Sequence, residues 1–303
     1  MWASGDASAA IGDLFVGCAN SATTILVSTT GGGQLDTFTN LYRGVVGIEV
    51  DPINEHVYLT GGNYHTICRA NFDGSGLLRL DSVTSTNYAG GKAVFGERLD
   101  CAIDVSGNRI FITTGGAGQS VGVGSLDGTG GYTTLWNMSH RLNGIEYDPL
   151  GDKLYFADLD AGIYVANADG SGSPSLLYAG TEYRHLTLDP AHDMMYWADW
   201  SGYRILGAPM SGGSSHAVYS GLSARPYGID LDPASGDLYW SEVFGGTIYA
   251  GNTNGAAPTQ ISTVYDARGL ALLVAPIPEA ATVALVGLGL GVVAVRRRSR
   301  QRK

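Results

Sequence analysis

Six arginines stand at corresponding places along the chain, each just before a short apolar segment. A guanidinium group holds a carboxylate or phosphate through two parallel hydrogen bonds, and it also stacks on aromatic rings. Exposed Trp and Tyr beside Arg are typical of the energetic centres of protein interfaces. We interpret these arginines, with nearby aromatics, as a candidate ring that binds a partner or an anion. Ion pairing of each arginine with a neighbouring acid, and local packing of the aromatics, are the structural alternatives. The ring comprises Arg43, Arg98, Arg141, Arg184, Arg225, Arg268, Tyr64, Trp200 and Phe244.

Carboxylates form a second candidate site. Glu49, Glu146 and Asp230 each stand two residues before an aspartate that recurs along the chain, and small residues occupy the corresponding positions between them. Three carboxylates gathered about one axis could hold a hard cation such as calcium. Salt bridges to the arginines, or side chains facing the interior of the repeat, are the alternatives. No other cofactor is indicated, and neither HExxH nor GxSxG occurs.

Both sets of residues recur because the chain is built from internal repeats. Five segments align without gaps, and each has an aspartate followed seven residues later by an aromatic residue. The aspartates are 53, 44, 41 and 43 residues apart, which is the period of a four-stranded β-propeller blade. We expect the aromatics to pack between blades as core residues. The aspartates are Asp51, Asp104, Asp148, Asp189 and Asp232, and the aromatics are Tyr58, Phe111, Tyr155, Tyr196 and Tyr239.

A sixth unit is split between the two ends of the propeller. Residues 269–273 match an innermost strand, whereas residues 13–17 and 24–27 match a second and a third strand. Pairing the last strand with the first three closes the ring and removes free sheet edges. The sequence therefore predicts an all-β, six-bladed propeller over residues 11–274, with five complete four-stranded repeats and one blade shared by the termini.

The segments YFAD at 155–158, YWAD at 196–199 and YWSE at 239–242 resemble the YWTD, or LDL-receptor class B, propeller family. Weaker copies stand at 58–61 and 111–114. Members of this family are mostly non-enzymatic and bind proteins through the loop face of the propeller, and the resemblance implies the same for this chain.

The last 29 residues read as a separate segment. Residues 280–295 carry no charge, and residues 296–303 hold six bases, an arrangement that keeps the basic end of a membrane helix on the cytoplasmic side. Together with Pro278, Glu279 and Ala280 just upstream, residues 275–303 resemble the PEP-CTERM sorting signal of bacterial envelope proteins. The resemblance implies a short membrane helix and processing by an exosortase, although Ala280 replaces the usual second proline.

The N-terminus and the cysteines leave alternatives open. Residues 1–10 resemble the small-residue end of a signal peptide without its apolar part, which predicts a start assigned too late or a simple linker. Three widely spaced cysteines, Cys18, Cys68 and Cys101, are interpreted as buried thiols, with one disulfide plus a free thiol as the alternative.

The charge balance restricts the partners. Without Glu279 and the basic tail, the chain has 12 basic and 27 acidic residues, so nucleic acid is excluded as a partner. We favour a non-enzymatic binding scaffold for an envelope or matrix protein or polysaccharide, displayed outside the cytoplasmic membrane or exported through the envelope. The alternative is a lactonase-like propeller hydrolase or lyase that uses a metal at the axis.

Overall fold

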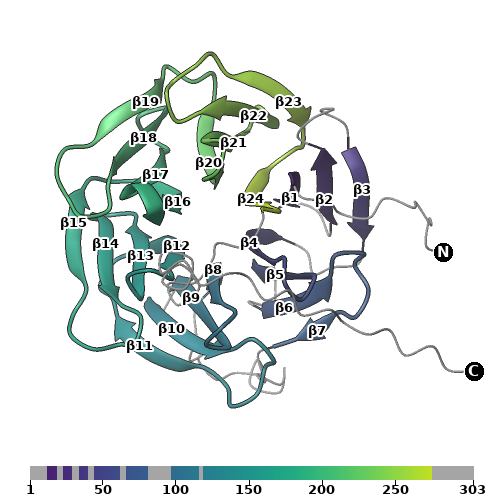
Figure 1. The fold of residues 1–303 in the computed structure, drawn as a ribbon, viewed down its shortest axis with the longest axis vertical. Coiled ribbons are helices and arrows are strands. Elements are labelled where there is room, and N and C mark those ends of the chain that lie inside the picture. The colour runs from purple at the N-terminus through teal and green to yellow at the C-terminus, as the bar shows by residue number, and fades with distance from the viewer. Residues whose placement is uncertain are drawn as a thin grey trace, which may run out of the picture.

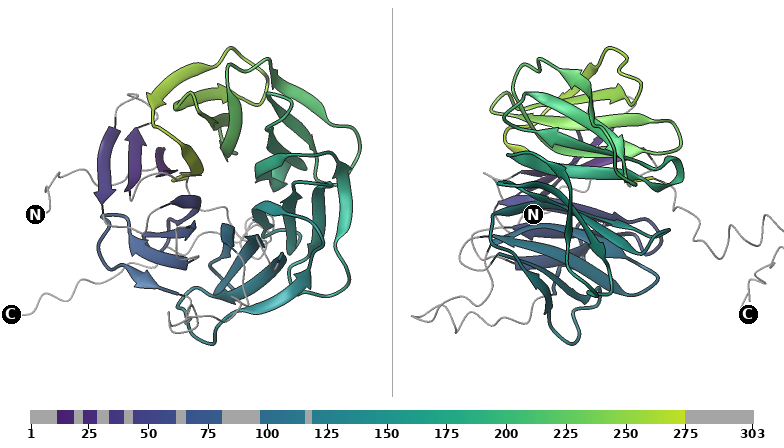
Figure 2. Two further views of the ribbon diagram at one scale, coloured as in Figure 1. Left: turned by 180° about the vertical axis from the view of Figure 1, so that it is seen from behind. Right: turned by 90° about the vertical axis from the view of Figure 1, so that its left-hand side faces the viewer.

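The computed structural model describes residues 12–18, 23–28, 34–39, 44–61, 66–80, 97–115 and 119–274. These residues form six antiparallel sheets of four strands each, arranged around a central axis as a β-propeller (Figure 1). Figure 2 shows the same ring from behind and edge-on. The predicted fold class is therefore confirmed for the described part of the chain.

The first three blades follow the chain in order, each running from the axis outward. Blade one is β4 (Val45–Asp51), β5 (His56–Gly61), β6 (Thr66–Asn71) and β7 (Leu78–Arg79). Blade two is β8 (Glu97–Asp104), β9 (Arg109–Gly115), β10 (Ser120–Ser125) and β11 (Thr133–Asn137). Blade three is β12 (Leu142–Asp148), β13 (Lys153–Asp158), β14 (Gly162–Asn167) and β15 (Ser175–Ala179).

Blades four and five repeat this order. Blade four is β16 (Tyr183–Asp189), β17 (Met194–Asp199), β18 (Arg204–Pro209) and β19 (His216–Ser220), with the short 3-10 helix η2 (Pro190–His192) between its first two strands. Blade five is β20 (Arg225–Asp232), β21 (Asp237–Val243), β22 (Thr247–Asn252) and β23 (Thr259–Thr263).

Blade six joins the two ends of the propeller, as predicted. Its innermost strand, β24 (Ala267–Leu272), pairs with β1 (Asp13–Cys18), which is followed by β2 (Thr23–Ser28) and β3 (Gln34–Thr39). The register places Phe15 opposite Ala271. A further backbone hydrogen bond from Gly12 N to the Leu273 carbonyl extends this pairing, at 2.7 Å. The closed ring leaves no innermost strand unpaired at the junction.

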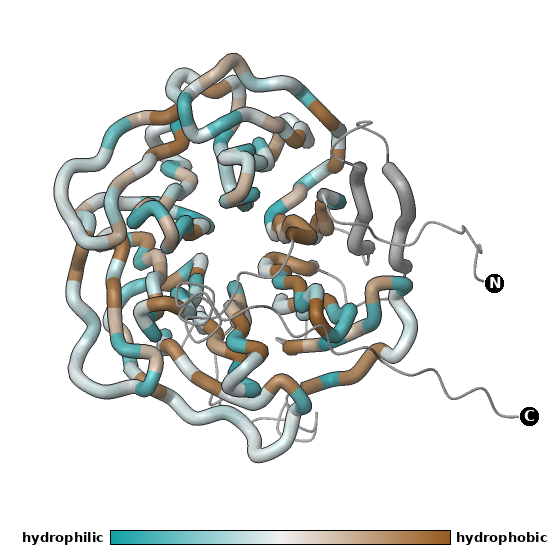
Figure 3. The backbone as a smooth tube through the Cα atoms, in the orientation of Figure 1, coloured by the Kyte–Doolittle hydropathy of each residue, from teal (hydrophilic) through white to brown (hydrophobic). Residues whose placement is uncertain are grey.

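The core lies between neighbouring blades. All five recurring aromatics are buried, with Phe111 and Tyr58 at 1% exposure or less. Trp197 and Trp240 follow two of them and are fully buried. Trp197 packs against Tyr178 of its neighbouring blade with ring centroids 5.4 Å apart. Figure 3 shows that apolar residues are spread over all the blades, as expected when each blade buries its faces against the next.

The recurring aspartates close the turns between first and second strands. Asp51 Oδ1 accepts hydrogen bonds from the backbone N–H groups of Ile53 and Asn54, at 2.9 and 3.1 Å. Asp104 and Asp148 make the same kind of contact with Gly107 and Leu150. An aspartate side chain that bonds the backbone two or three residues ahead stabilises a tight turn, so the repeated position has a structural role.

In two of the YWTD-like segments, YFAD and YWAD, the terminal acid fixes the turn between the second and third strands. Asp158 Oδ1 accepts from the N–H groups of Asp160 and Ala161, at 2.9 and 3.0 Å. Asp199 accepts from Gly202 N at 2.8 Å. Both carboxyls are almost fully buried, and a buried carboxylate with several donors holds its loop firmly.

All three cysteines are buried and none forms a disulfide, which confirms the interpretation as buried thiols. Within the described ranges, no helix is long and apolar enough to cross a membrane. The predicted membrane helix over residues 280–295, the basic tail, the sorting motif at 278–280 and residues 1–10 all lie outside the described residues.

Candidate partner-binding face

One face of the propeller collects the starts of the innermost strands and the ends of the second strands. The register places Arg225 at the start of β20 opposite Val243 at the end of β21. Leu142 of β12 likewise lies opposite Asp158, and Tyr183 of β16 opposite Asp199. We call this side the arginine face, because Arg141, Arg184, Arg225 and Arg268 all lie on it.

The arginines are placed slightly differently from the prediction. Arg141 directly precedes its innermost strand, but Arg225 is the first residue of β20, and Arg98, Arg184 and Arg268 are the second residues of their strands. The strands begin earlier than predicted because irregular pairing extends several of them toward the arginine face. Nothing is described of the Arg98 side chain, and Arg43 and Tyr64 lie outside the described residues.

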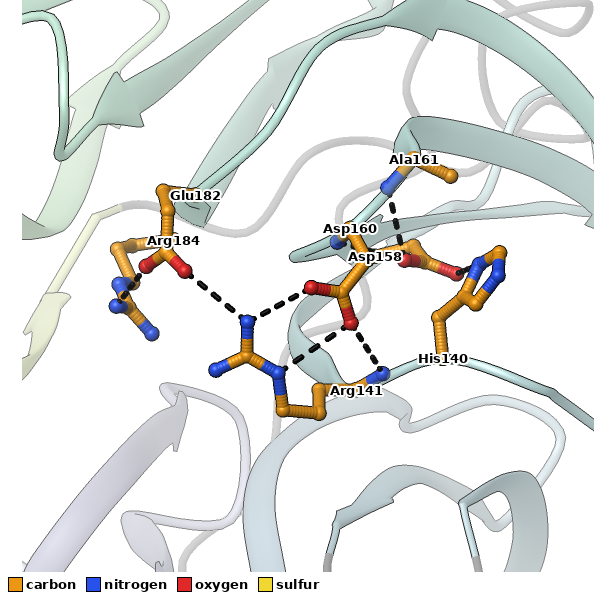
Figure 4. Close-up of polar contacts among 7 residues, drawn as sticks. All are labelled: His140, Arg141, Asp158, Asp160, Ala161, Glu182 and Arg184. Atoms are coloured by element: carbon orange, nitrogen blue, oxygen red, sulfur yellow. Dashed lines mark hydrogen bonds and ion pairs between the residues drawn. The ribbon is translucent and has the colours of Figure 1, made fainter.

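Three of the four described arginines are paired with acids, as the structural alternative requires. Arg141 Nη2 lies 2.7 Å from Asp160 Oδ1 and 3.1 Å from Glu182 Oε1 (Figure 4). Arg184 pairs with the other oxygen of Glu182, so that one carboxylate bridges two arginines. The Arg141 guanidinium holds the pKa of Asp160 below its usual value.

Arg268 completes this paired set. Its Nε donates to Asp266 Oδ1 at 2.9 Å, and its guanidinium lies 5.4 Å from the centre of the Tyr227 ring. Asp266 is buried at 3% exposure. Ion pairing therefore accounts for Arg141, Arg184 and Arg268 without any external ligand.

Arg225 is different. Its Nε donates to the hydroxyl of Tyr203 at 3.1 Å. The guanidinium lies over the rings of Trp200 and Tyr203, at 5.2 and 5.6 Å from their centres. Within the described part of the chain, no carboxylate forms an ion pair with it. The sequence treats the arginines as equivalent, and the structure distinguishes this one.

An aromatic cluster surrounds Arg225. Trp200 lies beneath Arg184 at 4.6 Å from guanidinium to ring centre, in addition to its contact with Arg225. Trp200 makes edge-to-face contacts with Tyr227 and Phe244, with ring centroids 5.7 and 5.8 Å apart. We refer to Trp200, Tyr203, Tyr227 and Phe244 as the aromatic cluster. Cation–π and edge-to-face contacts of this kind fix the side chains in place.

Two members of the aromatic cluster project toward solvent from strained backbone. Phe244 is 71% exposed, and Tyr203 is 37% exposed. Their φ angles of 67° and 51° lie in the left-handed region, which is costly for bulky residues and is found preferentially at functional sites. Trp200 and Phe244 were predicted for this face. Tyr203 and Tyr227 were missed, because nothing in their spacing marks them.

A buried polar layer lies below the aromatic cluster. The His185 ring packs on Tyr227 with centroids 5.2 Å apart, and its Nδ1 lies 3.6 Å from Asp100 Oδ2. Burial lowers the pKa of His185 to about 3, so this imidazole is neutral at physiological pH. Asn143 Nδ2 donates to the Tyr227 hydroxyl at 3.1 Å. These contacts fix Tyr227 from below.

The predicted carboxylates do interact with one another. Burial and the charge of Asp230 raise the pKa of Glu49 well above its usual value. Burial and the charge of Glu49 do the same for Glu146. Burial raises the pKa of Asp230 to about 6, against hydrogen bonds from Leu272 N and Leu231 N. We call these three, with Asp100, the axial carboxyls.

Asp100 was not predicted as a member of this group. Burial raises its pKa well above the usual value, although its Oδ2 accepts a hydrogen bond from Ile145 N at 3.1 Å. In the described residues, no group of three or more His, Cys, Asp or Glu side chains is arranged to hold a metal ion. The calcium site at Glu49, Glu146 and Asp230, on which the enzyme alternative depends, therefore stays a prediction.

The sequence and the fold were compared with those of known proteins. No model of a known protein family matches the chain. A segment of 60 residues, 19% of the chain, is 40% identical to the low-density lipoprotein receptor-related protein 5 of Mus musculus, and covers 4% of that receptor. A chain in the crystal structure of a nidogen/laminin complex matches with a TM-score of 0.71 and 17% identity, over 87% of this chain and 99% of that one. The structural match supports the propeller fold, and the sequence match is confined to a short part of both chains.

Proposed function

We propose that this chain is a non-enzymatic binding scaffold that engages a protein partner through its arginine face. The observation that carries the proposal is the guanidinium of Arg225, which lies between aromatic rings at the surface and has no acid partner in the described part of the chain. The neighbouring Phe244 exposes 71% of its surface from a strained backbone. Arg, Trp and Tyr in one cluster are typical of interface hot spots.

Rigidity of the face adds support. Asp199 holds the turn that carries Trp200 and Tyr203. Glu242 Oε2 accepts hydrogen bonds from Ser223 Oγ and Ala224 N, both at 2.7 Å, and so holds the connection just before β20. Side chains that are already ordered lose little entropy when a partner binds. The matching structure comes from a complex of nidogen with laminin, which is consistent with a propeller that binds a protein.

A variant pair tests this function. The full chain is used to capture proteins from an extract of the cells that produce it, with Arg225→Gln and Arg109→Gln compared with the wild type. Arg109 lies at the opposite face and is paired with Asp104 and Asp152, both at 2.7 Å. A partner that is lost with Arg225→Gln and retained with Arg109→Gln supports the proposal. A partner retained by both variants contradicts it.

We also propose that the scaffold is displayed at the outer side of a bacterial membrane. The support is the sequence of residues 275–303, with its apolar stretch and basic end. Because β24 ends at Leu272, such an anchor would leave directly from the innermost strand of blade six. Membrane fractionation of the full chain and of a chain ending at residue 274 tests this: the anchor predicts membrane association of the first alone, and equal distribution of both would refute it.

A polysaccharide of the envelope is the second candidate ligand, because acidic sugars carry carboxylates that an arginine can bind.

The proposal of membrane display includes processing by an exosortase at residues 278–280. Mass spectrometry of the mature C-terminus tests it directly, since cleavage removes the apolar stretch and an intact C-terminus refutes processing.

A further inference from the structure

We infer that the partner presents a carboxylate, from an Asp or Glu side chain next to an apolar residue, to the guanidinium of Arg225. This inference rests on the proposed function and names the chemistry of the partner at that site. It follows from three features of the arginine face: an arginine without an ion-pair partner among the described residues, two guanidinium groups over the Trp200 ring, and the exposed Phe244.

The guanidinium of Arg225 is oriented before any partner arrives. Its Nε donates a hydrogen bond to the Tyr203 hydroxyl at 3.1 Å, and the guanidinium group lies over the rings of Trp200 and Tyr203. The edge formed by its two Nη groups donates to no other residue in the described part of the chain. Two parallel donors on a fixed plane match the two oxygens of a carboxylate.

The neighbouring arginines explain why this position is selective. Arg141, Arg184 and Arg268 are neutralised by Asp160, Glu182 and Asp266. Of the four arginines described on the arginine face, Arg225 is thus the one without an ion-pair partner among the described residues. The chain without its C-terminal segment has 12 basic and 27 acidic residues, so an acidic partner is repelled elsewhere on the surface. A carboxylate placed at Arg225 is attracted, and such a combination of local attraction and general repulsion gives specificity.

The aromatic cluster favours a peptide over a sugar. Carbohydrates commonly stack on a free aromatic face, but the Trp200 ring is already covered by the guanidinium groups of Arg184 and Arg225. Phe244 is the most exposed ring of the aromatic cluster, at 71%, and it makes an edge-to-face contact with Trp200, with centroids 5.8 Å apart. Such a ring suits contact with an aliphatic or aromatic side chain. The expected segment therefore has an acidic and an apolar residue side by side.

A peptide selection tests the inference. Twelve-residue peptides displayed on phage are selected on the full-length chain in nonionic detergent, and the best binders are synthesised together with counterparts in which each Asp or Glu is replaced by Asn or Gln. Dissociation constants are then measured for the wild type and for Arg225→Gln, Phe244→Ala and Arg109→Gln.

The inference expects the acidic peptides to bind about tenfold more tightly than their amide counterparts. It also expects this preference to vanish in Arg225→Gln and to persist in Arg109→Gln. Peptides that need Phe244 but show no acidic preference would overturn the inference and leave the proposed function intact.

Two further outcomes are decisive. Binding that is indifferent to both Arg225→Gln and Phe244→Ala would overturn the proposed function as well. If no peptide is selected, alginate serves as the second probe: binding of this polyuronate that is lost in Arg225→Gln would replace the protein partner with an acidic polysaccharide, and would overturn the inference.

Discussion

Replacing Phe244 by Asn should weaken partner binding but leave the stability of the fold nearly unchanged. The residue holds a φ of 67°, and such a left-handed conformation costs a bulky residue about 1–2 kcal/mol. Asn tolerates this conformation because its short side chain bonds to the local backbone. Phe244 is 71% exposed, so little burial is lost. The edge contact with Trp200 contributes about 0.5–1.5 kcal/mol.

The two effects of Phe244→Asn therefore nearly cancel. We expect a change of less than about 1 kcal/mol in the free energy of unfolding, which shifts Tm by about 2–4 °C at most. Binding at the arginine face should fall at least tenfold, because truncation of a hot-spot aromatic costs about 2 kcal/mol or more and about 1.4 kcal/mol corresponds to tenfold. Differential scanning fluorimetry and isothermal titration with a selected peptide measure the two quantities.

Phe156→Ala is the matched control. This phenylalanine is fully buried in blade three, so its truncation should cost about 3–5 kcal/mol and lower Tm markedly. If Phe244→Asn lowers Tm as much as Phe156→Ala, the ring is part of the core. If Phe244→Asn leaves binding unchanged, the aromatic cluster is not the binding surface.

Three further predictions concern the axis, the turns and the thiols. Glu146→Gln removes a carboxyl whose raised pKa makes ionisation in the folded state unfavourable, so the wild type should lose stability as pH rises above the unfolded pKa of that group. The variant should therefore raise Tm more at pH 7.5 than at pH 4.5. An equal rise in Tm at both pH values would contradict the electrostatic coupling of the axial carboxyls. Asp199→Ala leaves Gly202 N and Arg204 without their acceptor, so it should lower the free energy of unfolding by about 3 kcal/mol and weaken binding. An unchanged Tm in a melting curve would show that the turn does not depend on this carboxyl. The three buried thiols should resist a disulfide reagent in the native chain and react fully in denaturant, whereas rapid native reaction would refute their burial.

Much of the fold could be predicted because it is encoded locally. An aspartate that closes a turn and an aromatic that fills the space between blades must recur in every repeat, and both leave a fixed spacing. The strands predicted for the split unit, residues 269–273, 13–17 and 24–27, differ from β24, β1 and β2 by at most two residues at either end. The split blade could be predicted because the missing strand at one end matched the surplus strand at the other.

The candidate site was harder to predict because its properties depend on neighbours in space. Arg225 and Arg141 look alike in the sequence, but Asp160 and Glu182 pair with Arg141, and no acid takes this place beside Arg225 among the described residues. The left-handed backbone of Phe244 also has no sequence signal, since Gly usually marks such positions.

Asp100 was missed for a reason of register. It stands two residues before Ala102, which lies opposite Phe111 just as Glu146 lies opposite Tyr155. Residues two apart on a strand point to the same face, so Asp100 joins the axial carboxyls from one step nearer the arginine face. An alignment restricted to one position per repeat could not show this.

Site-specific photo-crosslinking tests the central claim, that the arginine face binds the partner, most directly. Benzoylphenylalanine is placed at position 244 on the arginine face or at position 53 on the opposite face, in the turn after β4, where Phe244 and Ile53 are 71% and 63% exposed. In the cells that produce the chain, we expect discrete protein adducts from position 244 that disappear with Arg225→Gln, and none from position 53. Equal adducts from both positions, or adducts from position 53 alone, would contradict the account.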